Sequence, residues 1–314
     1  MEKFYLRIVL ICIPLLLFTL ACKKKKAFDE ENGQAAEDVR RSQEQNDEAV
    51  SDVNIAIMEQ SLLRGGVSST TSTKTELCGL DIDSLEIYSG ILQLKYNGTV
   101  CKGLKKTGTI RITLLDYPIK KWKNQECRIQ LEFINYKVSH NDGRTVQFDG
   151  AASLTNQTGN TWYEMKYLNA SNLIQIQTAS GVKVTIDESN TAIFNINRSL
   201  TFNYNSVGKF TSCKIEGLGV SNGINNLENW GQNRDGNNYT SQVNVPIVWK
   251  STCGSVSPSE GEVSIKVDEK DFAMICNYGV NSEGLNSTAS DCPYGWKVSW
   301  SYKSDTNTRV FAYN

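Results

Sequence analysis

The chain has 314 residues, of which 33 are Lys or Arg, 34 are Asp or Glu and one is His, so its formal net charge is −1. This balance lacks the basic excess of a general nucleic-acid-binding protein. A single histidine excludes a histidine-rich metal site, and the chain has no C-x-x-C, Walker A or dinucleotide fingerprint. We therefore expect no nucleic-acid partner, no cofactor and no metal site.

The chain begins with a targeting segment. Lys3 and Arg7 form a short positive region, and residues 8–21, IVLICIPLLLFTLA, are an apolar stretch that ends at Ala21. This stretch is short for a membrane-spanning helix but has the length of a signal-peptide core. The pattern predicts a signal peptide over residues 1–21.

A cysteine follows the signal peptide directly. This arrangement resembles the bacterial lipoprotein processing site, which implies lipidation of Cys22 after cleavage. Thr19 stands where that site usually has Leu, with Leu17 and Leu20 nearby. The alternative is an ordinary secretory signal followed by an unrelated cysteine. Several acyl chains on Cys22 would give stable attachment to a membrane.

Residues 22–65 are predicted to hold the lipid-anchor cysteine and a helical spacer. The apolar stripe of this helix is weak before Ala49 and stronger after it, so we expect it to dock only at its C-terminal end. A partner-binding helix is the alternative. The Ser/Thr-rich stretch over residues 66–76 predicts a flexible linker.

From residue 77 to 314 the sequence alternates apolar and polar residues between Gly, Asn and Asp turns. "GTIRITLL" (108–115) is one such strand, and "RIQLEFINYKV" (128–138) changes phase in the middle, which indicates a β-bulge. "NDG" (141–143) predicts a hairpin turn. The pattern predicts an all-β domain, an antiparallel meander or sandwich-like arrangement, without a helix and with a weak internal boundary near residues 206–212.

The seven cysteines that follow Cys22 favour disulfides in an exported protein. An odd number leaves at least one free thiol, and spacing alone leaves the connectivity open. The pairs we expect, in order of preference, are Cys78–Cys101, Cys253–Cys292 and Cys127–Cys213, with Cys276 left over.

The candidates for catalysis are few. His140 stands beside the predicted hairpin turn, where a solvated histidine is the usual finding. A pair of carboxylates could hydrolyse a glycoside, and five acids lie on or beside predicted strands: Glu132, Asp149, Glu164, Asp187 and Glu188. Because their pairing in space cannot be read from sequence, we assign no catalytic residue.

The loop "NWGQNRDGNNYTS" (229–241) is a candidate ligand-facing loop. It partly matches a calcium loop, but both end ligands of that pattern are missing, so a structural loop is favoured. If its aromatic rings are exposed, it could stack on a sugar; the residues of interest are Trp230, Asn233, Asp235, Asn237 and Tyr239. A second aromatic set, Trp296, Val298, Trp300 and Tyr302, shares one face of a strand and is expected to be core.

These features together resemble uncharacterised envelope lipoproteins of the Bacteroidota phylum. The stretches that carry the resemblance are "ACKKKK", "YNGTVCKGLKKTGTIRITL", "RTVQFDGAASLTNQTG", "VNVPIVWKSTCGSVSPSEGEVSI" and "NYGVNSEGLNSTASDCPYGWKVSW". The resemblance implies an outer-membrane location and a cysteine-bearing β-domain behind a helix. It implies no activity. Lys23–Lys26 stand where surface-exported relatives carry acids, so the periplasmic or surface face stays open.

The sequence therefore predicts a lipid-anchored envelope protein whose role is structural or the binding of a glycan or protein ligand. The alternative is a carboxylate-based hydrolase of envelope or extracellular polysaccharide. We expect a non-catalytic protein held at the membrane through its N-terminal lipid.

Overall fold

The structure is a computed structural model and describes residues 30–65, 79–83, 86–101, 103–253, 258–268, 272–287, 292–302 and 305–313. The predicted signal peptide, Cys22, the linker and Cys78 lie outside the described residues. Ala36–Asn314 form one compact unit, and the following description concerns that unit. The described part of the first 35 residues is the beginning of helix α2.

The helices are α2 (Glu30–Glu59), α3 (Ser61–Arg64) and α4 (Trp162–Tyr167), with single-turn 3₁₀ helices η1 (Ile87–Ser89) and η2 (Ser251–Cys253). The strands are β1 (Leu80–Asp83), β2 (Ile91–Cys101), β3 (Leu104–Leu114), β4 (Cys127–His140), β5 (Thr145–Asn156), β6 (Asn172–Ile186), β7 (Asn190–Tyr204), β8 (Phe210–Gly217), β9 (Gly219–Ser221), β10 (Ile224–Gln232), β11 (Asn238–Lys250), β12 (Pro258–Val267), β13 (Phe272–Val280), β14 (Gly295–Tyr302) and β15 (Asp305–Ala312).

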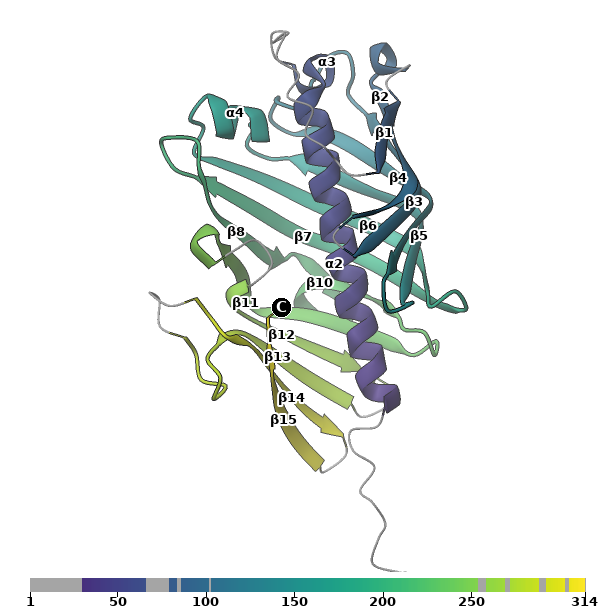
Figure 1. Cartoon of the computed structure of the whole chain (residues 1–314), viewed down its shortest axis with the longest axis vertical. Coiled ribbons are helices and arrows are strands. Elements are labelled where there is room, and N and C mark those ends of the chain that lie inside the picture. Colours follow the sequence, from purple (N-terminus) through teal and green to yellow (C-terminus); the bar gives the residue numbers. More distant parts are fainter. Residues whose placement is uncertain are drawn as a thin grey trace, which may run out of the picture. The chain divides into compact units, whose positions relative to one another are not determined.

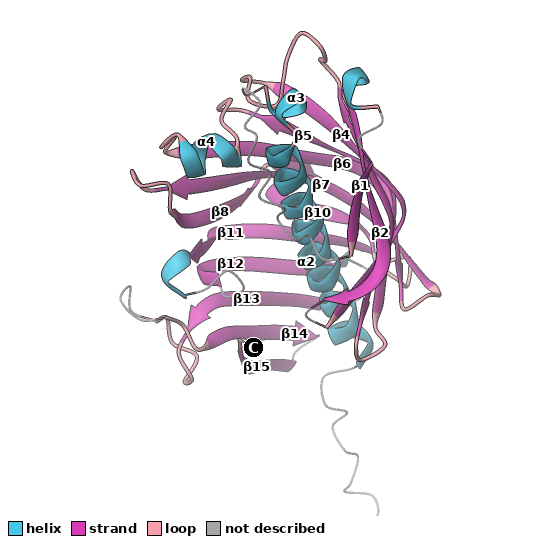
Figure 2. Ribbon diagram, turned by 45° about the horizontal axis from the view of Figure 1, so that its top comes forward, coloured by secondary structure: helices cyan, strands magenta, loops and turns pink. Residues whose placement is uncertain are grey.

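All fifteen strands belong to one sheet, in which every neighbouring pair is antiparallel. The order is β1 to β7, then β10 to β15, with β8 beside β7 and β11, and β9 beside β10. The all-β prediction is confirmed, and most of the sheet is a meander. In the described residues the strands form a single curved sheet rather than two stacked ones (Figure 2).

Helix α2 lies across one face of this sheet (Figure 1). Its C-terminal half is apolar toward the sheet, where Val50, Val53 and Ile57 are buried. Burial of side chains of this size contributes about 1.5–3 kcal/mol each as an upper estimate. The sheet meets them with rows of aliphatic side chains such as Leu92, Ile112 and Leu131, which are paired across β2, β3 and β4 and are fully buried.

The N-terminal half of α2 is buried as well, although it is polar. Asp38, Arg41 and Gln45 are each less than 5% exposed. The prediction that this helix docks only at its C-terminal end is therefore wrong for the described residues. Hydrophobic periodicity could not reveal this docking, because the contacts of this half are made by hydrogen bonds and ion pairs.

The bulge predicted in β4 is confirmed. The register between β4 and β5 shifts between Phe133 and Tyr136, and Asn135 adopts φ 50°. Ile134 points away from the core as a result and is 40% exposed. Gly108 on β3 fits beneath the bulge, since a Cβ at this position would lie 2.1 Å from the Asn135 carbonyl oxygen.

Two other predictions for residues 77–314 are wrong. The region contains helix α4, which starts with a capping box between Thr161 and Glu164; that T-x-x-E spacing was the signal available in the sequence. The boundary near residues 206–212 is a hairpin turn instead, because residues 205–209 connect β7 to β8 inside the same unit.

The cysteine predictions have mixed outcomes. The Cys253–Cys292 disulfide is confirmed, with a Cα–Cα distance of 5.1 Å. Cys276 is free, as expected. Cys101 is disulfide-bonded, and its predicted partner Cys78 lies outside the described residues.

The Cys127–Cys213 pair is wrong, because both residues are free thiols. Cys127 begins β4 and Cys213 lies on β8. Three strands separate β4 from β8 in the sheet, which at about 4.8 Å per step is about 19 Å. A disulfide needs its two Cα atoms within about 7 Å.

Candidate functional site

The most polar buried region of the described chain is the interface between α2 and the sheet, which we call the polar seam. Its helix side is formed by Asp38, Arg41, Ser42, Gln45, Asn46, Asp52 and Asn54, and its sheet side by Gln175, Gln177, Arg198, Glu228 and Asn229, all less than 9% exposed. Buried polar groups destabilise a fold unless they are hydrogen-bonded. The partners of these groups therefore decide how the helix is held.

Two reciprocal amide pairs fix α2 on β6. Asn46 Nδ2 donates to Gln177 Oε1 at 3.2 Å, and Gln177 Nε2 donates back to Asn46 Oδ1 at 3.0 Å. Asn54 and Gln175 repeat the arrangement with 3.1 and 2.7 Å. Each pair satisfies two donors and two acceptors only when the helix has this one position along the strand.

Charged groups continue the seam on both sides of the amide pairs. Arg198 is fully buried, donates to Gln177 Oε1 at 2.8 Å and pairs with Asp47 of α2. Asp52 of α2 accepts from the Tyr96 hydroxyl at 2.9 Å and from Lys106 Nζ at 2.7 Å. The helix is thus held by ion pairs to β7 and β3, by a hydrogen bond from Tyr96 of β2 and by the amide pairs to β6.

Glu228 on β10 is the one acid of the seam's sheet side. It accepts a hydrogen bond from the Ser241 hydroxyl at 3.0 Å. Burial raises the pKa of Glu228 to about 7, although the Arg198 charge and the Ser241 hydrogen bond act in the opposite direction. The charge of this carboxyl therefore changes near neutral pH.

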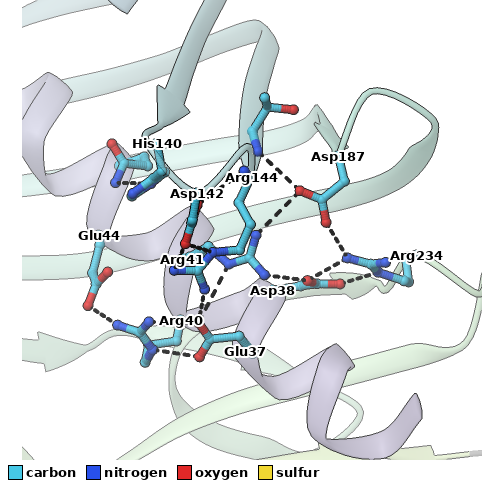
Figure 3. A network of polar contacts seen from close by, with 12 residues as sticks. Glu37, Asp38, Arg40, Arg41, Glu44, His140, Asp142, Arg144, Asp187 and Arg234 are labelled. Atoms are coloured by element: carbon cyan, nitrogen blue, oxygen red, sulfur yellow. Dashed lines mark hydrogen bonds and ion pairs between the residues drawn. The ribbon is translucent and has the colours of Figure 1, made fainter. Parts of the chain in front are cut away.

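Three hairpin turns meet the N-terminal half of α2 in an arginine–carboxylate cluster (Figure 3). Asp187, in the β6–β7 turn, accepts from Arg41 Nη1 at 3.5 Å and from Arg234 Nη2 at 3.3 Å. Arg234, in the β10–β11 turn, also makes a two-pronged contact with Asp38 of α2. Two carboxylates and two arginines thus connect two turns to the helix.

The β4–β5 turn joins the same cluster. Arg144 reaches Glu37 Oε1 at 3.3 Å and pairs with Asp142 of its own turn at 2.5 Å. Burial alone would raise the pKa of Glu37, but the hydrogen bond from Arg40 and the charges of Arg40, Arg41 and Arg144 lower it. The carboxylate is therefore kept ionised by the arginines around it.

His140 ends β4 and lies beside this cluster. Its Nε2 is 3.5 Å from Gln45 Nε2 of α2. Partial burial lowers the pKa of His140, and the charge of Arg144 lowers it further. Within the described chain the histidine has no carboxylate or nucleophile as hydrogen-bond partner. Its side-chain contact is with Gln45 of the helix.

A separate pocket of about 230 Å³ lies around Trp230 on β10. Trp230 stands in a cross-strand row with Asn195 on β7 and Thr240 on β11. The β9 strand approaches the indole closely, since a Cβ on Gly219 would lie 2.4 Å from Trp230 Cζ3. The other polar residues that line the pocket are Ser221, Asn222, Gln232, Asn238 and Asp268.

The predicted ligand-facing loop is divided by the structure. Trp230 and Tyr239 both line the pocket, but Tyr239 is only 1% exposed and its ring packs on Phe194 with 5.6 Å between centroids. Asn233 is buried, and its Oδ1 accepts from the backbone N–H groups of Asp235 and Asn237. The stretch from 233 to 237 is therefore a turn closed on itself, as the structural interpretation expected.

The five candidate carboxylates are engaged separately. Asp149 accepts from Asn135 N and Gln147, Glu164 is the acid of the α4 capping box, Asp187 belongs to the arginine–carboxylate cluster, and Glu188 pairs with Lys137 at 2.7 Å. Glu132 is exposed and lies opposite Arg111 in the β3–β4 register. No two of these acids share a hydrogen-bond or ion-pair partner in the described chain.

The aromatic set on β14 is only partly core. Val298 is buried, whereas Trp296 and Trp300 are partly exposed, and the side chain of Tyr302 is not described. Trp296 stacks on Phe311 of β15 with 4.8 Å between centroids, and Arg40 of α2 lies 5.9 Å from its ring. These rings face each other across the strands and serve the packing of α2 on the sheet.

Within the described residues, no helix is both long and apolar enough to cross a membrane, and no cluster of three or more His, Cys, Asp or Glu could hold a metal ion. Searches with the chain find no matching family model, no similar curated protein and no similar solved structure.

Proposed function

We propose that the protein is a lipid-anchored module of the cell envelope that binds a neutral saccharide in the Trp230 pocket. The observation that carries this proposal is the composition of the pocket, in which an indole, amide side chains, hydroxyls and one carboxylate surround a volume of about 230 Å³. Sites for drug-sized ligands measure about 300–1,000 Å³, so this pocket suits a single sugar ring.

The chemistry of the lining supports a sugar. An indole offers a flat apolar surface to the C–H face of a pyranose. Amides both donate and accept hydrogen bonds, and a carboxylate accepts two, which suits the hydroxyl groups around a sugar ring. The lining contains no Lys or Arg, so it offers nothing to attract an anionic ligand.

Parts of the lining are fixed before a ligand arrives. Asn195 Nδ2 donates to the Trp230 carbonyl oxygen at 3.1 Å, and its Oδ1 accepts from Gly181 N at 3.0 Å. Gln232 and Asn222 are exposed and are the side chains that would meet the sugar hydroxyls. Asp268 would accept from a further hydroxyl.

The binding test uses the full chain in detergent on a glycan array, followed by titration of the best ligand. We expect Trp230→Ala and Asp268→Asn each to weaken binding about fivefold or more, because each removes a contact worth about 1 kcal/mol or more. Tyr88→Ala, which removes an exposed ring elsewhere, is the control and should bind as the unmodified chain does. A blank array contradicts the saccharide proposal.

The anchor part of the proposal rests on the signal peptide and Cys22. Growth with a labelled fatty acid should label the unmodified protein and leave Cys22→Ser unlabelled. Proteolysis of intact cells then places the β-domain, since digestion indicates the cell surface and protection indicates the periplasm. Labelling of Cys22→Ser at the level of the unmodified protein would contradict lipidation at this residue.

A further inference from the structure

One end of the sheet forms a continuous surface, which we call the end face: η1, residues 115–126, α3, α4 with Leu168, and residues 205–209. The segments contact one another directly. Trp122 N donates to Leu63 O at 2.8 Å and Lys123 N to Arg64 O at 3.2 Å, which joins the β3–β4 loop to α3. Figure 1 shows α3 and α4 at this same end.

The other segments complete the surface. The Arg64 guanidinium lies 3.7 Å from the Tyr163 ring centroid, which joins α3 to α4. Gly208 lies so close to α4 that a Cβ would be 2.1 Å from the Lys166 carbonyl oxygen, and a Cβ on Gly90, just after η1, would be 2.7 Å from Tyr117 Cβ. Side chains from five separate segments therefore share one face.

Large apolar and aromatic side chains of the end face are turned to solvent. Ile119 is 91% exposed at the tip of the β3–β4 loop, and Val207 is 78% exposed in the β7–β8 turn. The others with large exposure are Leu62, Tyr88, Leu115, Tyr167 and Leu168. Single exposed apolar residues need no explanation, but a group of this size on one face marks an interaction surface.

Lysines surround these side chains. They are Lys120, Lys121, Lys123, Lys166 and Lys209, and none of them forms a salt bridge within the described part of the chain. Two acids of the face already have partners: Asp116 pairs with Arg128 at 3.2 Å, and Glu164 belongs to the capping box of α4. Glu126 is the exposed acid that remains.

We infer that the end face docks on an anionic lipid surface. Exposed aliphatic tips that insert among acyl chains, tyrosines at headgroup level and lysines facing lipid phosphates are the features of an interfacial membrane contact. A protein partner would need a shape to match, whereas the end face offers protruding tips and lysines that have no acidic partner in the described chain. This contact is independent of the lipid on Cys22 and of the Trp230 pocket.

The attraction is shared among the lysines. Each lysine near an anionic surface strengthens partitioning about fivefold, which corresponds to about 1 kcal/mol at 25 °C. Burial of the exposed parts of Ile119 and Val207 adds to this attraction. Since the electrostatic part is screened by salt, docking should weaken as the ionic strength increases.

The test measures amide hydrogen exchange of the full chain, held by its own N-terminus on vesicles. One set is phosphatidylcholine alone, and the other contains about one third phosphatidylglycerol, a strongly anionic surface. We expect slower exchange at residues 115–126 and 205–209 on the anionic vesicles only. The slowing should decrease about fivefold for Lys123→Gln and more for the double variant Lys120→Gln/Lys123→Gln.

Matched variants separate docking from folding. Ile119→Ser should lose most of the protection on anionic vesicles, whereas Ile134→Ser, at an exposed apolar position of the sheet, should keep it. Lys183→Gln, at an exposed lysine of β6, is the control for charge. All five variants should exchange as the unmodified chain does in the absence of vesicles, since the changed side chains are at the surface.

Two outcomes would overturn the inference. Equal exchange on neutral and anionic vesicles would show that no anionic surface is recognised. Protection that increases with the density of protein on the vesicle, at constant lipid composition, would assign the end face to contact between copies of the chain.

Discussion

Asn54 and Gln175 are separated by 121 residues in the chain and exchange two hydrogen bonds between their buried side-chain amides. Asn54 also donates to the Val50 carbonyl oxygen at 3.0 Å. The pair holds α2 at one position on β6, and the Asn46–Gln177 pair repeats it two helical turns away. The polar seam therefore attaches the helix to the sheet and also fixes its position along the strands.

Replacement of one member of the pair should destabilise the fold more than replacement of both. Gln175→Leu leaves the Asn54 amide buried without its partner, which costs about 1–3 kcal/mol. The double variant Asn54→Leu/Gln175→Leu removes the unpaired groups and should recover much of this loss. Urea unfolding of Gln175→Leu, Asn54→Leu and the double variant measures the difference, and additive losses would contradict the pairing.

The arginine that pairs with the buried acid of the cluster should matter more than the exposed arginine. Asp38 is 3% exposed, and Arg234→Met removes the two-pronged contact from this buried carboxylate, which should reduce the free energy of unfolding by about 2–4 kcal/mol. Arg144 is 43% exposed, so Arg144→Met should cost less than about 1 kcal/mol. Similar losses for both would show that the cluster is solvated.

Glu228 makes stability depend on pH. Its pKa is about 7 in the folded chain and near 4.5 when unfolded, so the folded state holds its proton more tightly. Folding is thus penalised progressively as pH rises from about 4.5 to about 7, and the full penalty remains above that range. The advantage of Glu228→Gln in unfolding free energy should grow by about 2 kcal/mol between pH 5 and pH 8. An advantage that is constant with pH would contradict a raised pKa.

The free thiols should be inert in the folded protein. Burial raises the pKa of Cys127 to about 11 and that of Cys213 and Cys276 to about 12. At pH 8 the thiolate fraction is then about one in a thousand or less. Alkylation followed by mass spectrometry should modify these cysteines only after denaturation, and modification within minutes in the native state would show that they are accessible.

The Cys253–Cys292 disulfide closes a loop between β11 and β14 and should stabilise the fold by about 2–4 kcal/mol. Cys253→Ser/Cys292→Ser removes it without leaving a single reactive thiol. Thermal unfolding should therefore occur at a lower temperature for the double variant. Reduction of the unmodified chain also breaks the disulfide of Cys101, so it should lower the unfolding temperature at least as much. An unchanged unfolding temperature in the double variant would contradict this prediction.

The sheet could be predicted from sequence because its signals are local. Alternation of apolar residues in "GTIRITLL" and the change of phase around Ile134 are properties of neighbouring residues, and both reappear as β3 and the bulge of β4. The docking of α2 could not be predicted in this way. Its N-terminal half meets the sheet through Asp38, Arg41 and Gln45, which hydropathy assigns to solvent.

The sequence indicated which kinds of residue the candidate site contains, but not which residues come together there. Trp230 was singled out as a possible sugar contact and lines a pocket, which leaves that prediction untested. The burial of Tyr239 could not be recognised, because it depends on Phe194, 45 residues earlier in the chain. The pocket also needs Asp268 and Asn195 from distant strands. Such a grouping follows from strand order, which no local pattern specifies.

The seam has a consequence for the order of folding. Asp38 and Arg234, which contact each other, are 196 residues apart in sequence, so the docking surface of α2 does not exist until the strands up to β11 have paired. The helix that is synthesised before the sheet is thus among the last of the described elements to become ordered. Contacts of such long sequence separation slow folding, and the delay leaves the polar groups of the seam in contact with water while the sheet is assembled.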